Sequence, residues 1–348
     1  MRIAIATVQV PFVRGGAELL AESLCAELLA AGHEAEIVSV PFKWYPAERI
    51  AEHMLACRLM DLRESLAGPI DRVIGLKFPA YMIAHPSKVV WLLHQHRGAY
   101  DLWGTPYGDL TAAPGGAHVR ASIHNADLAI LPEARAIYTL SANVSRRLSE
   151  YCGIASVPLH HPPPGAQRIR SGEYGSYMLF PSRINSVKRQ ALAIEALSYT
   201  RHPVHVAFLG MADTPEYGEQ LQLKAIVSGV ETRLTWLGGV TEEKKLELYG
   251  DCRAVIFPPL DEDYGYVTLE AMLAQKAVVT CTDSGGPLEF VQDGRTGLVC
   301  LPTPQALAAA LDRLWEDPTL ATRLGQGGLE RYAEMSIGWE GVLQCLLA

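Results

Sequence analysis

Residues 254–272 read AVIFPPLDEDYGYVTLEAM, and this stretch decides the fold class. A short apolar run is followed by two prolines, an acidic loop around Gly265 and a helix-forming segment. A buried strand, a turn and a helix in this order form the repeating unit of a parallel sheet covered by helices. The stretch therefore predicts an α/β domain that binds ligands in the loops after its strands.

The same alternation extends along all 348 residues. We expect strands at 3–8, 33–40, 72–76, 88–93, 126–131, 136–140, 177–180, 204–209, 233–237, 254–257 and 277–280. We expect helices at 17–31, 45–65, 144–151, 304–317, 318–332 and 339–347. Four prolines in 158–165 predict a stiff linker, because proline continues neither a helix nor a central strand. We therefore expect one domain at 1–160 and a second at 166–330, with a cleft between their open sheets.

Composition and charge narrow the function classes. The formal net charge of −8 argues against nucleic acid as a partner, because phosphate-tracking surfaces need clustered Lys and Arg. The seven cysteines are scattered without a C-x-x-C pair, which indicates reduced thiols. The chain shows no signal peptide and no apolar run of about 18 residues, so we expect a cytoplasmic protein.

Two carboxylates in the opening stretch are candidate ligand-binding groups. Glu262 lies in the loop, and Glu270 lies eight positions further on, in the first turns of the helix. Because ionised carboxylates accept from paired hydroxyls, one could hold a sugar and the other a ribose diol. Spacing alone fits equally well a Glu270 that satisfies the helix N-terminus and a solvated Glu262.

Two cations follow an earlier predicted strand. Arg183 and Lys188 lie five positions apart on a strand-to-helix loop. A guanidinium fork and an ammonium could clamp a diphosphate there and stabilise a departing nucleoside diphosphate. Solvated cations in an ordinary loop would give the same pattern.

Two glycine pairs also follow predicted strands. Gly15-Gly16 opens a helix, and Gly285-Gly286 forms a turn. In both places backbone N–H groups could approach an anion, although glycine pairs are common in plain turns.

Two histidines end the strand predicted at 88–93. His94 and His96 have a spacing that could ligate a metal, but a third ligand with sensible spacing is missing. We therefore expect no metal and no cofactor.

These motifs resemble those of family 4 glycosyltransferases, which have the GT-B fold. The resemblance rests on the Glu262…Glu270 pair, the Leu-Glu-Ala-Met that ends at Met272, the Arg183-to-Lys188 arrangement and both glycine loops. It covers nearly the whole chain, and the motifs occur in family order. One departure is Tyr264-Gly265-Tyr266, where the family more often has Phe-Gly-Leu.

The resemblance implies two Rossmann-like α/β domains that face each other across a cleft. The first would be the acceptor side and the second the donor side, and a C-terminal helix in 331–348 would cross back to the first domain. The implied reaction is retaining, metal-independent transfer of a hexose from a UDP- or GDP-linked sugar to a saccharide acceptor.

The resemblance also implies residue roles. The catalytic residues would be Glu262, which contacts the transferred sugar, and His94, with His96 as the reserve. Glu270 would hold the ribose. The other implied donor-binding residues are Gly15, Gly16, Arg183, Lys188, Gly265, Tyr266, Val267 and Thr268.

The acceptor side is the least specified part. Related enzymes often build surface polysaccharides or glycolipids on lipid carriers, which implies a lipid-linked saccharide; a soluble small-molecule acceptor is the alternative. His96, Tyr100 and Trp103 could line the acceptor cleft, since sugars stack on aromatic rings. The apolar and basic segment 50–60 predicts either a helix lying on the inner face of the cell membrane or a core-facing helix.

Two rival classes share these features. One is a GT-B epimerase or phosphorylase, which the glutamate pair and the missing cofactor-anchoring lysine motif disfavour. The other is a non-catalytic sugar-binding protein, which would need no diphosphate clamp.

Overall fold

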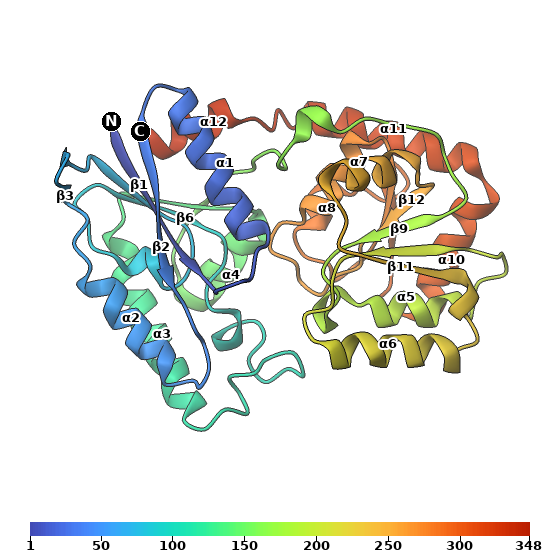
Figure 1. Cartoon of the computed structure of the whole chain (residues 1–348), viewed down its shortest axis with the longest axis horizontal. Coiled ribbons are helices and arrows are strands. Elements are labelled where there is room, and N and C mark those ends of the chain that lie inside the picture. The colour runs from blue at the N-terminus through green and yellow to red at the C-terminus, as the bar shows by residue number, and fades with distance from the viewer. The chain divides into compact units, whose positions relative to one another are not determined.

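The computed structural model describes residues 1–348, which form two compact units. The first unit comprises Met1–Pro164 and Gly338–Ala348, and the second comprises Gly165–Ile337. Each unit contains a six-stranded sheet in which all neighbouring strands are parallel (Figure 1). The predicted α/β class with two Rossmann-like sheets is confirmed.

The first sheet has the strand order β2-β1-β5-β6-β7-β8. Its strands are β1 (Arg2–Gln9), β2 (Glu34–Pro41), β5 (Arg72–Gly75), β6 (Lys88–Leu92), β7 (Ala136–Thr139) and β8 (Val157–Pro158). A small antiparallel pair consists of β3 (Glu64–Ser65) and β4 (Gly68–Pro69). The helices of this unit are α1 (Gly16–Ala30), α2 (Arg49–Leu59), α3 (Gly116–Ile130), α4 (Ala142–Cys152) and α12 (Trp339–Leu347).

The last helix, α12, packs against the first sheet. The Trp339 ring lies edge-on to Trp91 of β6, with 6.2 Å between the ring centroids. The buried Arg72 of β5 donates from Nη1 to the carbonyls of Leu346 at 2.7 Å and Ala348 at 2.9 Å. The predicted return of the C-terminal helix to the first domain is confirmed.

The second sheet has the strand order β11-β10-β9-β12-β13-β14. Its strands are β9 (Met178–Pro181), β10 (Val206–Leu209), β11 (Leu234–Gly238), β12 (Ala254–Ile256), β13 (Ala277–Cys281) and β14 (Gly297–Cys300). Its helices are α5 (Gln190–Leu197), α6 (Pro215–Val227), α7 (Glu242–Asp251), α8 (Tyr266–Leu273), α9 (Pro287–Phe290), α10 (Pro304–Glu316) and α11 (Pro318–Glu334). This is the 3-2-1-4-5-6 order of nucleotide-binding α/β folds, and it reverses between β9 and β12.

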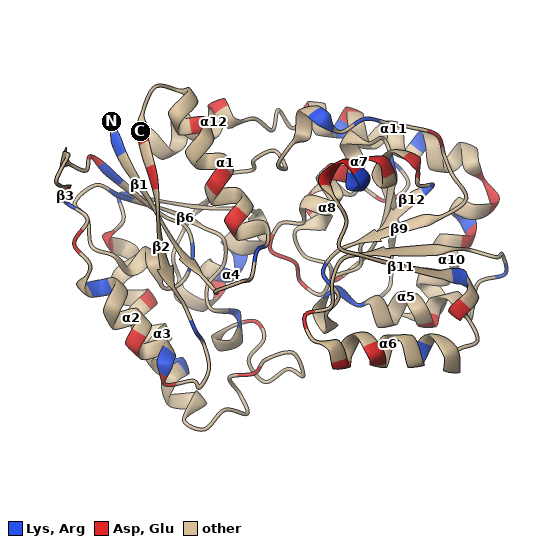
Figure 2. Ribbon diagram, in the orientation of Figure 1, with Lys and Arg blue, Asp and Glu red and all other residues tan.

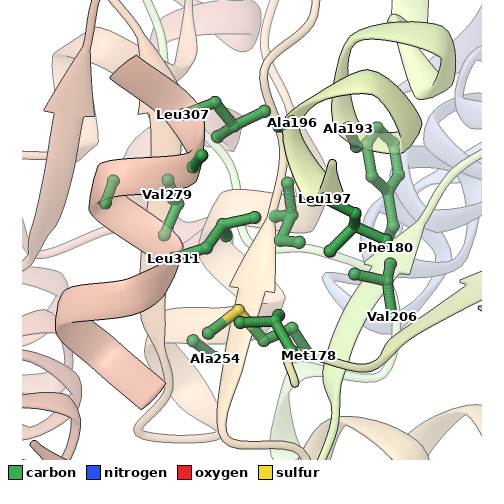
Figure 3. Close-up of a cluster of buried hydrophobic side chains, with 14 of the residues drawn as sticks. Met178, Phe180, Ala193, Ala196, Leu197, Val206, Ala254, Val279, Leu307 and Leu311 are labelled. Carbon is green, nitrogen blue, oxygen red and sulfur yellow. The ribbon is translucent and has the colours of Figure 1, made fainter. Parts of the chain in front are cut away.

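Both faces of the second sheet are buried under helices. Helices α5, α6 and α10 cover one face, and α7 and α8 cover the other (Figure 1). Figure 3 shows Leu307 and Leu311 of α10 in one buried cluster with Leu197 of α5 and the strand residues Val279 and Phe180. Because both faces are packed, the strands hold the loops at their carboxyl ends in fixed positions.

One predicted strand is wrong. Residues 126–130 belong to α3, in which Val119, Ile123 and Asp127 are buried at helical spacing. A short apolar run does not distinguish a strand from a helix end, and this run was read without the helical pattern upstream of it. Strand β14 was not predicted, and neither were the two-residue strands β3, β4 and β8. The helix expected at 45–65 is shorter, because α2 ends at Leu59 and β3 follows it.

Candidate active site

The loops after β9 and β12 meet at the point where the strand order of the second sheet reverses. Such folds bind ligands at this edge. The Leu260 N–H donates to the Val187 carbonyl at 2.7 Å, which joins the two loops. The Asn185 side chain accepts from the Lys188 N–H at 3.1 Å and so caps the short turn Ser186–Lys188. These bonds fix the backbone of Lys188 beside the loop that follows β12.

Lys188 and Glu262 come together at this edge. The Lys188 ammonium contacts Glu262 Oε2 and lies 5.4 Å from the centroid of the Phe257 ring. The two side chains are 15% and 18% exposed, so they are largely shielded from water but still within reach of a ligand. Two residues that were predicted to act on one donor therefore share one location.

The glycine turn after β13 is bonded to the Glu262 loop. The Glu262 backbone donates to the Ser284 carbonyl at 2.9 Å and accepts from the Gly286 N–H at 2.8 Å. A Cβ at Gly286 would lie 2.7 Å from the Tyr264 carbonyl oxygen, so only glycine allows this close approach. The predicted turn thus supports the position of Glu262.

Glu270 is held on α8 by two residues that sequence analysis did not single out. The Tyr249 hydroxyl donates to Glu270 Oε2 at 2.6 Å, and Lys245 Nζ lies 3.0 Å from Oε1. Burial and the Glu270 charge raise the pKa of Tyr249 well above its usual range, so its hydroxyl remains a donor. Each carboxylate oxygen keeps a further lone pair, so the 7%-exposed Glu270 can still accept from ligand hydroxyls.

Helix α7 supplies both of these residues, and its sequence carries the signal that could have found them. Lys245 and Tyr249 are four positions apart and therefore share one helix face. Figure 2 shows acidic and basic residues along the ribbon of α7, whose first turn holds Glu242 and Glu243.

The loop after β9 carries three cations, and each has its own carboxylate partner. Arg183 is 53% exposed and lies 3.2 Å from Asp213 Oδ1. Arg189, which sequence analysis did not name, binds Asp283 through two hydrogen bonds of 2.8 and 2.7 Å. This loop therefore carries one cation more than was predicted, and all three cations are paired with acids.

The other predicted donor-binding residues of this unit form the start of α8. Gly265 precedes the helix with a φ of +92°, in the left-handed region that favours glycine. Tyr266 and Val267 are half-buried and have surface to offer a ligand. Thr268 is fully buried, and its hydroxyl has no hydrogen-bond partner. Thr268 therefore offers no surface to a ligand.

In the first unit, Gly15 and Gly16 lie at the N-terminus of α1, after β1. The Gly15 N–H donates to Glu18 Oε2 at 2.7 Å. A carboxylate therefore already occupies one of the backbone donors that an anion would use.

His94 and His96 line one cavity of about 260 Å³ after β6. His94 Nδ1 lies 2.6 Å from the Gln95 carbonyl, which assigns the proton to Nδ1. His96 packs edge-on against Phe78, and burial lowers its pKa to about 4, so its ring is neutral at pH 7. The charged residues of this cavity are Lys77, Arg97 and Asp109.

The histidine pair has no third ligand arranged beside it. No group of three or more His, Cys, Asp or Glu side chains in the chain is arranged to hold a metal ion. That catalysis needs no metal ion remains a prediction.

A second cavity, of about 310 Å³, adjoins the histidine cavity. The two share Val10, Phe42 and Trp44 as lining residues, and Tyr45 and His53 line the second. A polar end at the histidines is thus continuous with an aromatic end.

Tyr100 and Trp103 lie elsewhere. The Tyr100 ring is 3% exposed, and its hydroxyl donates to the buried Asp127 at 2.7 Å. Trp103 lies under the Arg120 guanidinium, 4.8 Å from the ring centroid. Neither residue is among those lining the two cavities, so this geometry gives no support to their predicted acceptor contacts.

The segment 50–60, predicted as either a membrane-surface or a core-facing helix, lies in α2 except for Met60. Ile50, Met54 and Cys57 are buried, so one face of α2 packs in the core. Leu55 and Leu59 are exposed on the remainder. Charges of both signs lie along this helix (Figure 2), and the arginines in and near it pair with acids: Arg49 with Glu52, Arg58 with Glu133 and Arg63 with Asp61. Membrane contact stays a prediction. None of the helices combines the length and apolar character needed to cross a bilayer.

One cavity of the second unit lies away from the candidate site. It measures about 460 Å³ and is lined by Tyr177 and His205, which directly precede β9 and β10, and by Trp315. It therefore lies toward the amino ends of these strands, away from the loops that carry the glutamates and cations.

Solved structures of GT-B proteins match the fold of the whole chain. Sucrose-phosphate synthase from Thermosynechococcus elongatus superposes with a TM-score of 0.78 and 16% identity, over 99% of this chain and 98% of that one. Anabaena HepE, solved in complex with UDP and glucose, gives 0.74 and 16%, over 100% and 98%. At these identities the likeness shows the fold alone, and that fold is GT-B.

The second unit carries the sequence similarity to a known family. Residues 167–331 match the family described as glycosyl transferases group 1. Among curated relatives, the alpha-1,3/1,6-mannosyltransferase ALG2 of Dictyostelium discoideum is 36% identical over 122 residues, which are 35% of this chain and 29% of that protein. The chain thus spans less than a third of this relative's length.

Proposed function

We propose that this protein transfers a hexose from a nucleotide-sugar to a saccharide acceptor, with retention and without a metal ion. The observation that carries the proposal is the Lys188–Glu262 contact at the strand-order reversal of the second sheet, with Glu270 fixed nearby in sequence on α8. The family match and the fold shared with a UDP-and-glucose complex support a nucleotide-sugar donor. UDP and GDP both fit the proposal.

The donor would bind through its hydroxyls and its diphosphate. Glu270, immobilised by Tyr249 and Lys245, would accept from the ribose diol. Lys188 and Arg183 would exchange their present carboxylate partners for diphosphate oxygens, and Glu262 would turn to the sugar. When the bond between the sugar and the diphosphate breaks, negative charge grows on the diphosphate, and a cation next to it lowers the barrier.

The acceptor would bind to the first unit. We assign the role nearest the reacting centre to His94, because it lies at the polar end of the two adjoining cavities. An acceptor sugar would occupy that end, and the aromatic end around Trp44 would take an apolar carrier. This arrangement favours a lipid-linked saccharide over a small soluble acceptor. It also fits a protein that contacts the membrane peripherally through this unit.

Donor hydrolysis tests the donor half of the proposal. Incubation with a panel of UDP- and GDP-sugars should release the nucleoside diphosphate, and Glu262→Ala and Lys188→Ala should each reduce release by at least about 100-fold. Lys224→Ala is the matched control, because Lys224 forms an exposed pair with Glu195 at 2.8 Å in the same unit and should keep full activity. Release that persists unchanged in both site variants would overturn the assignment.

The acceptor half has a separate test. A saccharide linked to a polyprenyl carrier in detergent micelles should accept the sugar more efficiently than the same saccharide in free form. Trp44→Ala should raise KM for the linked acceptor and leave donor hydrolysis unchanged, since Trp44 lines only the two cavities of the first unit. Equal KM values for the two acceptors would favour a soluble acceptor.

A further inference from the structure

Two cysteines end neighbouring strands of the second sheet. Cys281 is the last residue of β13 and Cys300 the last of β14, and they are direct partners in the parallel register. Residues two apart in a strand share a face, so Cys281 lies on the side of Val279 and Cys300 on the side of Leu298, in one cluster. Their sulfur atoms are 3.9 Å apart. The proposed function uses neither thiol.

The two thiols differ in access and in acidity. Strand β14 forms the edge of the sheet, and Cys300 is partly exposed, whereas Cys281 is fully buried. The hydrogen bond from the Cys281 thiol lowers the pKa of Cys300 and raises that of Cys281. A partly exposed thiol that is more easily ionised, next to a buried one, matches the division of roles in dithiol chemistry.

We propose that Cys281 and Cys300 form an oxidisable dithiol, which a small disulfide such as oxidised glutathione converts into an intramolecular disulfide. The Cys300 thiolate attacks one sulfur of the oxidant, which forms a mixed disulfide and releases one glutathione thiolate. The Cys281 thiol then loses its proton and attacks Cys300 Sγ, which releases the second. Two protein thiols are oxidised, and one glutathione disulfide is reduced to two glutathione thiols.

Closure requires a local rearrangement. The sulfurs must move from 3.9 Å to about 2.05 Å, between residues that the parallel ladder holds directly opposite each other. A bond formed against the sheet geometry is more easily reduced than a structural disulfide, so glutathione or dithiothreitol should reopen it.

The pair is connected to the candidate donor site. The Cys281 N–H donates to Ser284 Oγ at 3.1 Å, and the Ser284 carbonyl accepts from the Glu262 N–H at 2.9 Å. A shift of Cys281 would therefore displace the turn that supports Glu262. We expect oxidation to weaken binding of the donor nucleotide, a consequence that rests on the proposed function.

The experiment treats the full-length protein with oxidised glutathione, blocks the remaining thiols and maps tryptic fragments by mass. Trypsin cuts after Lys276, Arg295 and Arg313, so Cys281 and Cys300 fall in different fragments that only the proposed bond can join. The expected result is this joined pair of fragments, while the other five of the seven cysteines carry the blocking reagent. Cys300→Ser and Cys281→Ala should each abolish it. Cys345→Ser, a partly exposed cysteine of the first unit, should not change it.

Nucleotide binding gives the second readout. Calorimetry measures the affinity of the protein for UDP and for GDP. Oxidation should weaken binding to the wild type about tenfold, and dithiothreitol should restore it. Oxidation should leave the affinity of Cys300→Ser unchanged. A glutathione adduct on Cys300 without the joined fragments would overturn the dithiol, and unchanged affinity in a protein with the mapped bond would overturn the coupling. If the reduced protein binds neither nucleotide, the proposed function fails, while the fragment map still decides the dithiol.

Discussion

At Glu270, two neighbouring side chains determine how well the carboxylate can bind a ribose. Tyr249→Phe removes the hydrogen bond of 2.6 Å and leaves the packing of the ring. A hydrogen bond to a charged group contributes about 1.5–3 kcal/mol, so we expect donor KM to rise about tenfold while kcat changes little.

Tyr177→Phe is the matched control for this variant. The Tyr177 hydroxyl donates to the Leu248 carbonyl at 2.9 Å, next to Tyr249 in the chain but not to Glu270. It should lower stability without raising donor KM, and an equal rise in both variants would contradict a specific role for Tyr249.

The buried ring of His161 should make the stability of the first unit depend on pH. Its ring is fully buried between Trp91 and Trp339, and burial lowers its pKa to about 3 from an ordinary 6.5. Between pH 3 and pH 6.5, His161 is protonated in the unfolded chain but neutral in the folded chain. The neutral ring's contribution is therefore complete above pH 6.5 and is lost as pH falls, by about 1.4 kcal/mol per pH unit.

Urea unfolding between pH 4 and 7.5 measures this slope. His161→Phe should make stability less dependent on pH in this window, whereas His118→Gln, at an exposed position on α3, should keep the wild-type slope. Parallel curves for wild type and His161→Phe would contradict the prediction.

The residues predicted from the sequence lie in loops that follow strands or in the first turns of the next helix. Lys188 and Glu262 are 74 positions apart, yet they could be assigned to one site because parallel strands end at the same edge of a sheet. Lys245 and Tyr249 were missed, because a residue in a helix reaches the site only through the packing of that helix. Arg189 was missed although it follows Lys188 directly in the chain. The ion pairs of Lys188 and Arg183 were also not predictable, since loop geometry decides which carboxylate lies closest.

At the scale of elements, the turn into α8 combines a backbone and a packing requirement. In Gly265→Ala the methyl group would meet φ +92° and lie 3.1 Å from Pro287 Cγ and 3.2 Å from Phe257 Cε1. We expect a loss of about 2–3 kcal/mol in stability and a rise in donor KM, because the turn carries the glutamates on both sides.

Gly294→Ala separates the two contributions. Gly294 has a φ of +72° with nothing within 4 Å of an added methyl group, so only the backbone term applies. Thermal unfolding should give a loss of about 1 kcal/mol and unchanged kinetics. A Gly265→Ala variant no worse than this control would show that the packing contacts relax freely.

Element prediction succeeded where a strand, a turn and a helix followed each other closely. It failed at α3, because the apolar end of the helix was taken as a strand although Val119 and Ile123 precede it at helical spacing. It also failed at β14, a four-residue strand at the sheet edge whose glycine start looks like a turn. Short edge strands depend on their neighbour for definition more than on their own sequence.

At the scale of the whole molecule, the chain leaves the first unit at Pro164 and returns to it at Gly338. The final eleven residues, 338–348, are therefore part of the first unit's stability, although they follow the second unit in sequence. Trp339→Ala removes a half-buried ring from Trp91 and His161, and we expect a loss of about 2 kcal/mol confined to the first unit.

Hydrogen exchange followed by mass spectrometry can locate this loss. In Trp339→Ala, exchange should become faster in β5, β6 and the segment around His161, and stay at wild-type rates in β9, β12 and β13. Trp315→Ala is the control, because Trp315 lies at the end of α10, where the Arg253 guanidinium sits 4.7 Å from the centroid of its ring. This variant should speed exchange only in the second sheet. If Trp339→Ala accelerated exchange equally in both sheets, the two units would unfold as one, and α12 would stabilise the whole chain instead of the unit it packs on.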